Sequence, residues 1–298
     1  MKIVFGTRGS ALALAQTEHI INKFRDVAPD VETEIIVIKT MGDHLNQASL
    51  AEIGGLGAFT REIEQALLSG KIDAAVHSLK DLPIEQPESL YVAAIAERQS
   101  PADVLVSPSG HSLESLPKGA QVGTSSLRRK AQLLLTRPDL HIGELRGNVP
   151  TRMAAARDGR FDAVVVAMAG LMRLALDREP GLYEIPQSQM LPAPGQGAIA
   201  LEIRKKDLAL AGYLQKMHDD AAAAEVCCER AILKAFGGGC RSPLGARAQC
   251  GGNRIHVEAL AADPESGRHV RIFRQGPTEH ALSLGLEIGG ELRAGLPV

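Results

Sequence analysis

A cysteine in a glycine-rich stretch is the residue whose surroundings most suggest chemistry. Cys240 lies within Gly-Gly-Gly-Cys-Arg-Ser-Pro-Leu-Gly at residues 237–245. The preceding segment, 221–236, has no Gly or Pro and places small apolar residues at helical spacing, so Gly237 is predicted to end a helix and Cys240 to lie on a loop. A thiol there is open to a bulky partner. Because most free cysteines have no reactive role, this stretch alone favours an unreactive loop cysteine.

The other cysteines point away from disulfides and metals. Cys227 and Cys228 lie inside the predicted helix, where they are expected to act as small hydrophobic residues against a core. The chain has four cysteines and no Cys-x-x-Cys pair, which argues for reduced thiols. Zinc is not supported either, because His218 and His256 do not give a paired-ligand spacing with them. No metal site is expected.

Arginines gather at or just after the ends of predicted strands. They are Arg8, Arg128, Arg129, Arg146 and Arg152. Ligands of α/β sheets bind at the carboxyl ends of the strands, so these positions suit an anion. Arg128 and Arg129 open a helix, where a cation opposes the helix dipole, which makes a local stabilising role a weak explanation for them. Several guanidinium groups together suggest more than one carboxylate or phosphate. The alternative is a solvated basic face.

One acidic residue stands at the end of an apolar strand. Asp81 lies in His-Ser-Leu-Lys-Asp-Leu-Pro at 77–83. Pro83 prevents the segment from continuing as a central strand, so Lys80 and Asp81 are expected at the edge of a cleft. An equally good interpretation of this segment alone is a turn aspartate that bonds its own backbone.

Composition excludes several classes of function. The 298-residue chain is 45% hydrophobic and 23% charged with a net charge of -2, which gives no global attraction to nucleic acid or anionic membrane. Aromatic residues are only 3%, with no Trp, so stacking platforms for single-stranded nucleic acid are missing. No Walker sequence occurs. The apolar run at the start is too short for a signal peptide and no run of 18 apolar residues follows, so we expect a cytoplasmic protein.

The sequence contains an internal duplication. Three segments, each containing a strand and a turn, recur in the same order: 3–10 and 121–126, 35–43 and 142–148, and 70–76 and 159–165. Chance is a poor explanation for three ordered matches. Each unit alternates strand and helix, which predicts two similar α/β domains with mostly parallel sheets and helices on both faces.

The remaining segments complete the predicted domain organisation. Residues 198–204 form a β-run that can return to the first sheet, and the tail predicts a helix, three antiparallel strands and a final helix. We expect a first α/β domain (1–97 with 197–216), a second (101–192) and a small C-terminal α+β domain with a three-stranded antiparallel sheet (219–298). The segment 43–59 is polar and glycine-rich enough for a mobile lid, or equally for an ordered surface loop.

Six blocks, taken in order, resemble the porphobilinogen deaminase family, also called hydroxymethylbilane synthase. The resemblance spans nearly the whole chain. The blocks are Gly-Thr-Arg-Gly-Ser at 6–10 with Gln16 and Thr17, His-Ser-Leu-Lys-Asp-Leu-Pro at 77–83, Gly-Thr-Ser-Ser-Leu-Arg-Arg at 123–129, Leu-Arg-Gly-Asn at 145–148 with Thr151 and Arg152, Pro-Ala-Pro-Gly-Gln-Gly at 192–197, and Gly-Gly-Cys at 238–240 with Pro243 and Gly245.

The resemblance implies a transferase of haem biosynthesis. Such an enzyme joins four porphobilinogen molecules, with release of ammonia, into the linear tetrapyrrole hydroxymethylbilane. The product grows on a dipyrromethane cofactor, which the protein assembles from two porphobilinogen units and holds covalently through a thioether at Cys240. The resemblance further implies a cytoplasmic monomer whose partner is the small-molecule substrate, with no nucleic-acid or membrane partner.

By the same resemblance, Asp81 is the catalytic acid and base. The implied cofactor-binding residues are Cys240, Lys80, Asp81, Thr124, Ser125, Ser126, Arg128, Arg129, Arg146 and Gly147. The implied substrate-binding residues are Arg8, Ser10, Gln16, Arg146, Arg152, Arg173 and Gln196. Their cationic groups would pair with the acetate and propionate groups of the pyrroles.

Two other classes of protein remain as alternatives. The predicted fold, two α/β domains around a cleft, is periplasmic-binding-protein-like, and proteins of that class hold anions without transforming them. The missing signal peptide argues against that class, and a covalent cofactor on Cys240 would exclude it. A cysteine-nucleophile enzyme is weaker, because no His can be tied to Cys240.

Overall fold

The computed structural model describes residues 1–40, 60–239 and 242–296. The predicted lid at 43–59 and Cys240 itself therefore lie outside the described residues. The chain divides into two compact units, Met1–Gln99 with Ala198–Ala223, and Ser100–Gly197 with Ala224–Val298.

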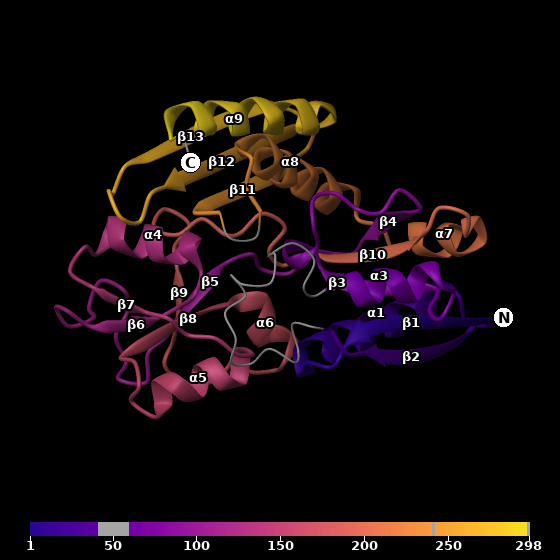
Figure 1. The fold of residues 1–298 in the computed structure, drawn as a ribbon, viewed down its shortest axis with the longest axis horizontal. Coiled ribbons are helices and arrows are strands. Elements are labelled where there is room, and N and C mark those ends of the chain that lie inside the picture. The colour runs from indigo at the N-terminus through magenta and orange to yellow at the C-terminus, as the bar shows by residue number, and fades with distance from the viewer. Residues whose placement is uncertain (41–59, 240–241, 297–298) are drawn as a thin grey trace. The chain divides into compact units, whose positions relative to one another are not determined.

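The first unit is built on a five-stranded mixed sheet (Figure 1). The strand order is β2 (Glu32–Ile38), β1 (Lys2–Arg8), β3 (Ala74–Ser78), β10 (Ile199–Arg204) and β4 (Leu90–Ile95). Strand β1 pairs in parallel with β2 and β3, whereas β10 pairs antiparallel with β3 and β4. The predicted return of residues 198–204 to the first sheet is confirmed. The helices of this unit are α1 (Ala11–Val27), α3 (Arg61–Leu68) and α7 (Leu208–Gln215).

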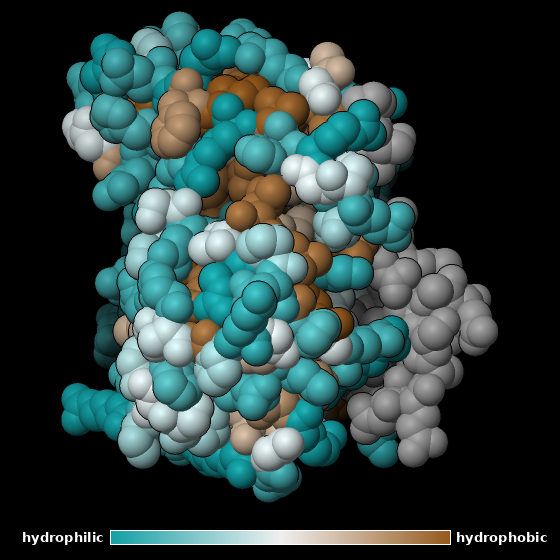
Figure 2. Space-filling model, turned by 90° about the vertical axis from the view of Figure 1, so that its left-hand side faces the viewer, coloured by the Kyte–Doolittle hydropathy of each residue, from teal (hydrophilic) through white to brown (hydrophobic). Residues whose placement is uncertain are grey.

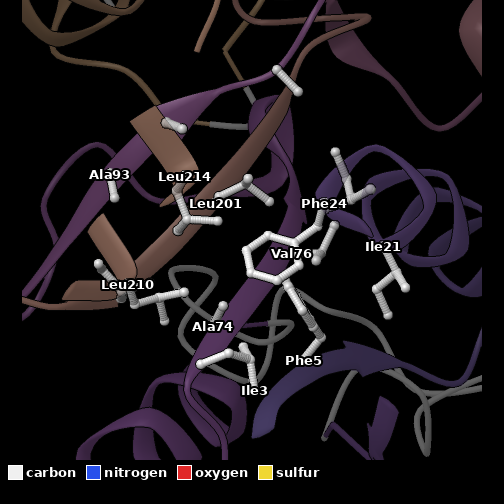
Figure 3. Packing of buried hydrophobic residues seen from close by; sticks show 14 of the residues in the cluster. Ile3, Phe5, Ile21, Phe24, Ala74, Val76, Ala93, Leu201, Leu210 and Leu214 are labelled. Carbon is white, nitrogen blue, oxygen red and sulfur yellow. The ribbon is translucent and has the colours of Figure 1, made fainter. Parts of the chain in front are cut away.

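Aromatic packing holds α1 and α7 against one face of this sheet. The rings of Phe5 on β1 and Phe24 on α1 meet edge to face with centroids 5.3 Å apart, and Tyr213 on α7 contacts Phe24 at 6.0 Å. Figure 3 shows Phe5 and Phe24 among apolar side chains from the strands and both helices. The opposite face packs against α3 through Ile63 and Leu67, both fully buried. Both faces are therefore covered, and burial of this apolar surface stabilises the unit.

The second unit contains a sheet of the same topology. Its strand order is β7 (His141–Gly143), β6 (Gln121–Gly123), β8 (Ala163–Ala167), β5 (Asp103–Val106) and β9 (Leu182–Ile185). Here β6 pairs in parallel with β7 and β8, while β5 pairs antiparallel with β8 and β9. Helix α4 (Leu127–Thr136) packs on one face, and α5 (Val149–Arg157) and α6 (Met168–Arg173) pack on the other.

The duplication predicted from the sequence is confirmed in backbone detail. Asp73 and Asp162 hold equivalent positions, and each carboxylate accepts a hydrogen bond from a backbone N–H of the first strand of its repeat, Val4 on β1 at 2.9 Å and Gln121 on β6 at 2.7 Å. Gly6 and Gly123 are also equivalent, because a Cβ at either would lie within about 3 Å of the side chain that precedes that aspartate, Ile72 at 2.2 Å and Phe161 at 3.1 Å. The two units therefore have the same residue types, Gly and Asp, at positions with the same packing and hydrogen bonding.

The prediction of mostly parallel sheets is confirmed, with one exception in each sheet. In each sheet four strands run in the same direction, and one strand, β10 in the first sheet and β5 in the second, runs antiparallel to both of its neighbours. Periodicity identifies a strand without giving its direction, and the added strand β10 is contributed by a distant segment of the chain.

The C-terminal segment forms a three-stranded antiparallel sheet, as predicted, of β11 (Leu244–Gly251), β12 (Arg254–Ala262) and β13 (His269–Pro277). Helix α8 (Asp220–Phe236) precedes it, and a short 3-10 turn leads into α9 (Ala281–Gly295). The two helices touch closely, because a Cβ added at Gly285 or Gly289 of α9 would lie 2.4 Å from a carbonyl oxygen of α8.

On the face shown in Figure 2, hydrophilic residues cover most of the surface and hydrophobic residues show mainly between them. Within the described ranges, no helix is long and apolar enough to cross a membrane.

Candidate functional site

The segment after β3 fixes the position of Asp81. Leu79 and Leu82 are each only 2% exposed and anchor the short 3-10 turn Leu79–Asp81 in the core, while the N–H of Leu79 donates to Ala198 O at 3.1 Å. Asp81 is exposed, and its carboxylate has no hydrogen-bond partner among the residues described. The alternative of a turn aspartate bonded to its own backbone therefore has no contact in the structure to support it.

Two buried polar pairs underlie this turn. The side-chain amide of Gln16 lies 2.9–3.0 Å from the hydroxyl of Ser78, at the end of β3. His77 Nε2 lies 3.1 Å from Glu202 Oε2 on β10, with both side chains buried. Gln16 is 2% exposed, so in this structure it contacts the strand that carries the Asp81 turn. Buried polar pairs of this kind fix a backbone in one arrangement.

Arg8 and Ser10 lie at the carboxyl end of β1, in the first unit. Arg8 is the last residue of β1, and Ser10 is the N-cap of α1, where its hydroxyl accepts a hydrogen bond from Ala13 N at 3.2 Å. A capping hydroxyl satisfies one of the free N–H groups at a helix N-terminus. Lys80, beside Asp81, is half-buried.

Arg128 and Arg129 form a buried cluster with Asp103, the first residue of β5. Asp103 Oδ2 accepts from Arg128 Nη1 at 2.6 Å, and Asp103 Oδ1 accepts from Arg129 Nη2 at 2.7 Å. The three side chains are 0–5% exposed. Burial alone would raise the pKa of Asp103, but the charges of Arg128 and Arg129 outweigh burial and hold that pKa well below its usual range. Arg128 and Arg129 thus have a local structural partner, although their place at a helix start had made a local stabilising role the weaker explanation.

The guanidinium of Arg128 donates its hydrogen bonds to the described residues through Nη1. Its Nη1 donates to Asp103 and also to Leu191 O at 2.7 Å. Its Nε is buried and has no partner in the part of the chain that the structure describes. An Nε–Nη2 edge matches the two oxygens of a carboxylate. Desolvation lowers the pKa of Arg128 despite Asp103, and a bound anion would relieve that cost.

The turn after β6 supplies hydroxyl groups. Thr124 is buried, and its Oγ1 accepts from Ser126 N at 3.2 Å. Ser125 Oγ donates to Leu145 O at 2.7 Å, and Ser126 caps α4. These three side chains order the loop at the helix N-terminus.

Arg146, Gly147 and Arg152 lie together after β7. Arg146 Nε donates to Glu144 Oε1 at 2.8 Å, and Arg152 Nε donates to Gly147 O at 2.8 Å. Gly147 has φ +110°, and a Cβ there would also meet Thr151 at 2.9 Å, so a side chain is excluded on both grounds.

Arg173 and Gln196 complete the polar residues of the second unit. Arg173 Nη2 donates to Gly197 O at 2.6 Å, its Nε is buried without a partner in the described chain, and burial lowers its pKa to about 10. Gln196 is 1% exposed, and its Nε2 donates to Pro101 O at 2.6 Å and to Asp103 Oδ1 at 3.0 Å. Gln196 thus joins the Arg128–Asp103 cluster.

The residues on either side of Cys240 are tied to each other. Gly239 N donates to Ser242 Oγ at 2.9 Å, and Ser242 N donates to Gly239 O at 2.9 Å. A Cβ at Gly238 would lie 1.9 Å from Ser242 Oγ, so this position requires glycine. Further along, Gly245 packs against Leu191.

The helical cysteines differ from each other. Cys228 is fully buried, and burial followed by the charge of Glu229 raises the pKa of its thiol to about 12. Cys227 is exposed, so the prediction that both pack against a core was wrong for it. Neighbouring positions on a helix point about 100° apart, which places them on different faces.

Sequence reasoning missed Asp103 and Glu229. Asp103 follows Ser-Pro-Ala and resembles a loop residue, yet it is fully buried. Glu229 is also 0% exposed, and its two oxygens accept from Gly195 N at 2.8 Å and from Ala248 N at 2.9 Å. An acidic residue within an otherwise apolar stripe of a helix was the available signal. In the described residues, no group of three or more His, Cys, Asp or Glu could hold a metal ion.

Family models match almost the entire chain. The model described as "Porphobilinogen deaminase, dipyromethane cofactor binding domain" matches residues 3–212, and "Porphobilinogen deaminase, C-terminal domain" matches residues 223–294. The chain belongs to the porphobilinogen deaminase family. Membership in this family confirms the resemblance seen in the sequence. The expected dipyrromethane cofactor was based on that resemblance.

Curated relatives in this family are similar over their full length. Porphobilinogen deaminase of Maridesulfovibrio salexigens is 43% identical over 293 residues, covering 98% of this chain and 95% of the relative. That of Syntrophus aciditrophicus is 44% identical over 295 residues, covering 99% and 95%. Among solved structures, a substrate binding domain of a putative amino acid ABC transporter from Streptococcus pneumoniae is 16% identical, covers 80% of this chain and 95% of its own, and has a TM-score of 0.46.

The donor set of the second unit fits the dipyrromethane cofactor of the porphobilinogen deaminase family. Pyrroles derived from porphobilinogen carry acetate and propionate groups, which need cationic forks and hydroxyl donors. The buried Nε atoms of Arg128 and Arg173 have no partner among the described residues, and hydroxyls lie near the N-terminus of α4. Buried donors without a partner are uncommon in folded proteins, so these two are available to a carboxylate ligand.

Proposed function

We propose that this protein is a porphobilinogen deaminase that joins four porphobilinogen molecules, with release of ammonia, into the linear tetrapyrrole hydroxymethylbilane. The observation that carries the proposal is the half-used guanidinium of Arg128. It is buried, fixed at Nη1 and left without a partner at Nε in the described chain, as a carboxylate-binding group should be. Family membership supplies the identity of the carboxylate ligand.

The cofactor would be held by Cys240 and by the second unit. Leu191 O accepts from Arg128, and Gly245 packs on Leu191, so the segment that follows Cys240 is anchored beside the arginine. A dipyrromethane bound there supplies a primer whose free pyrrole end accepts the next substrate. In this proposal Arg128, Arg129, Arg146, Gly147, Lys80 and the hydroxyls of Thr124, Ser125 and Ser126 bind its carboxylates and ring edges.

Asp81 would perform the acid–base chemistry. Its exposed carboxyl group, when protonated, can give a proton to the amino group that leaves porphobilinogen, and the carboxylate so formed can face the positive charge that develops on that pyrrole ring. It can afterwards accept the α-proton lost when the new carbon–carbon bond has formed. Leu79 and Leu82 hold the backbone on either side, so the carboxylate is displayed from a fixed turn.

The remaining arginines would bind the incoming substrate. The proposed residues are Arg8, Ser10, Gln16, Arg146, Arg152, Arg173 and Gln196. Within this set Gln16 and Gln196 are almost fully buried, so they would support the substrate site indirectly, Gln16 by holding the strand before Asp81 and Gln196 by holding the Asp103 cluster.

The proposal extends to domains, assembly and location. It assigns Asp81 to a first domain (1–97 with 197–216), the arginine cluster to a second (101–192) and Cys240 to a third (219–298). It also includes a monomer that works in the cytoplasm. Light scattering of the holoenzyme and fractionation of cells test the last two points.

The deciding experiment is incubation of the purified protein with porphobilinogen. We expect one ammonia released per porphobilinogen consumed and a linear tetrapyrrole as the product, measured by ammonia assay and mass spectrometry. Reversible binding of porphobilinogen with no release of ammonia would instead identify an anion-binding protein and overturn the proposal.

A further inference from the structure

Asp103 organises a cluster whose residues come from several parts of the second unit. It is the first residue of β5, is 0% exposed, and receives hydrogen bonds from both arginines of α4 and from Gln196. Arg129 Nε also reaches Asp103 Oδ1 at 3.2 Å. Few carboxylates serve so many donors unless their role is to fix the donors in place.

The charges of the cluster do not cancel. The two guanidinium groups contribute two positive charges and Asp103 one negative charge, all in side chains that are 5% exposed or less. A buried net charge is costly unless a partner balances it. The cluster therefore carries a net positive charge that a bound anion can balance.

The hydrogen bonds indicate which of the two guanidinium groups can bind this anion. Arg129 uses Nε and Nη2 on Asp103 and Nη1 on Val165 O at 2.8 Å, so each of its nitrogens has a partner. Arg128 uses Nη1 alone. Its Nε edge is thus the one that a ligand carboxylate can take, and Asp103 at the other end sets the direction of that edge.

The cluster is also braced from the C-terminal segment. Glu229 on α8 accepts from Gly195 N at 2.8 Å, and Gln196, the next residue, donates to Asp103 at 3.0 Å. The turn at Gly195 and Gln196 therefore contacts both Glu229 on α8 and Asp103, the carboxylate that orients Arg128.

We propose that Asp103 is a positioning residue that directs the Nε edge of Arg128 toward a carboxylate of the dipyrromethane cofactor, so that the protein takes up the cofactor efficiently. This inference rests on the proposed function. It assigns to Asp103 no contact with the reacting atoms, only control of the arginine that contacts the ligand.

The test compares cofactor loading in three full-length variants. Asp103→Asn keeps the shape but loses the charge, and Asp103→Glu restores the charge on a longer side chain. Asp139→Asn is the matched control, because Asp139 pairs with Arg137 through two contacts of 2.7 Å just beyond the opposite end of α4. Each apo-protein is mixed with porphobilinogen, and the two-pyrrole mass increase on the intact protein is followed with time. Thermal unfolding is measured on the same samples.

We expect Asp103→Asn to load about tenfold to a hundredfold more slowly, because a displaced binding group costs about that much. Asp103→Glu should recover part of the rate, and Asp139→Asn should load at the wild-type rate even if its thermal stability falls. Wild-type loading by Asp103→Asn overturns the inference. So does slowing in proportion to lost stability in both Asn variants, or failure of both Asp103 variants to fold, since each would mark a purely structural residue. Failure of the wild-type protein to load would instead overturn the proposed function.

Discussion

Arg128 Nη1 lies 2.6 Å from Asp103 Oδ2, while Nε of the same guanidinium is buried and has no partner in the described chain. One side chain therefore combines a fixed internal contact with an open carboxylate-binding edge. The two demands together require the planar fork of arginine, which a lysine ammonium cannot reproduce.

Arg128→Lys should consequently lose cofactor loading although it keeps the charge. We expect the loading rate to fall by about tenfold or more, because one ammonium cannot reach Asp103, Leu191 O and a ligand carboxylate together. The mass increase of the apo-protein with porphobilinogen measures it. Arg137→Lys, at the C-cap of α4, is the control and should load normally. Equal rates for the two variants would remove Arg128 from cofactor binding.

Asp103 should make stability depend on acidity in a defined range. Because Arg128 and Arg129 hold its pKa below the usual value, the carboxylate stabilises the fold above its unfolded pKa of about 3.9 and loses that effect as pH falls through the lower folded pKa. In urea unfolding, the difference between wild type and Asp103→Asn should be constant from pH 7 to about pH 5 and shrink below about pH 4. A difference that does not change with pH would contradict the ionised state of Asp103.

Cys240 should carry the cofactor. Protein purified from cells that make porphobilinogen should show two linked pyrrole units on the peptide containing Cys240, and Cys240→Ser should lose them. Cys228→Ser should keep them, because the Cys228 thiol is buried and its pKa is raised to about 12. Cys227→Ser is the more informative control, since Cys227 is exposed. Loss of the pyrroles in Cys227→Ser would move the attachment site, and loss in all three variants would indicate misfolding.

The repeated units were predictable because their packing requirements are local. Gly6 and Gly123 are dictated by side chains that face them, and the aspartates that precede β3 and β8 accept hydrogen bonds from β1 and β6, so the same residue types recur at both places. The reversed direction of β10 was not predictable in this way. The pairing of β10 with β3 depends on a contact between residues more than a hundred positions apart, which periodicity does not encode.

The candidate site was predictable by residue type and less so by environment. Arg128 and Arg129 stood out as cations at a helix start, but their partner Asp103 lies 25 positions upstream of Arg128. Gln16 and Gln196 were expected to contact substrate, and the structure buries both against other polar residues. Burial arises from tertiary packing, and a single sequence does not distinguish an inward polar side chain from an outward one.

Arg173 should lower the stability of the apo-protein and also bind the substrate. Burial lowers its pKa to about 10, so at pH 7 the charged form is less favourable in the folded state than in the unfolded one. Arg173→Met should therefore leave stability unchanged or raise it, by about 1 kcal/mol, and at the same time slow the addition of porphobilinogen to the holoenzyme. Urea unfolding and single-turnover assays measure the two effects. A large loss of stability in Arg173→Met would show that the arginine is structural.

Asp81 should be required for turnover and dispensable for folding. The side chain is exposed and makes no hydrogen bond to the described residues, so Asp81→Asn should leave the unfolding transition and substrate binding nearly unchanged. An amide can neither protonate a leaving amine nor balance a developing positive charge, so turnover should fall by orders of magnitude, as expected for an interaction made mainly in the transition state. Asp81→Glu keeps the carboxylate but moves it by roughly 1 Å, which can cost on the order of a hundredfold. Glu85→Gln removes an exposed carboxylate four residues away and should behave as wild type. The decisive measurement is single-turnover ammonia release by Asp81→Asn that already carries its cofactor, because this separates the chemical step from loading. Near-normal release there would exclude Asp81 from the reaction and leave it as an exposed residue of the turn.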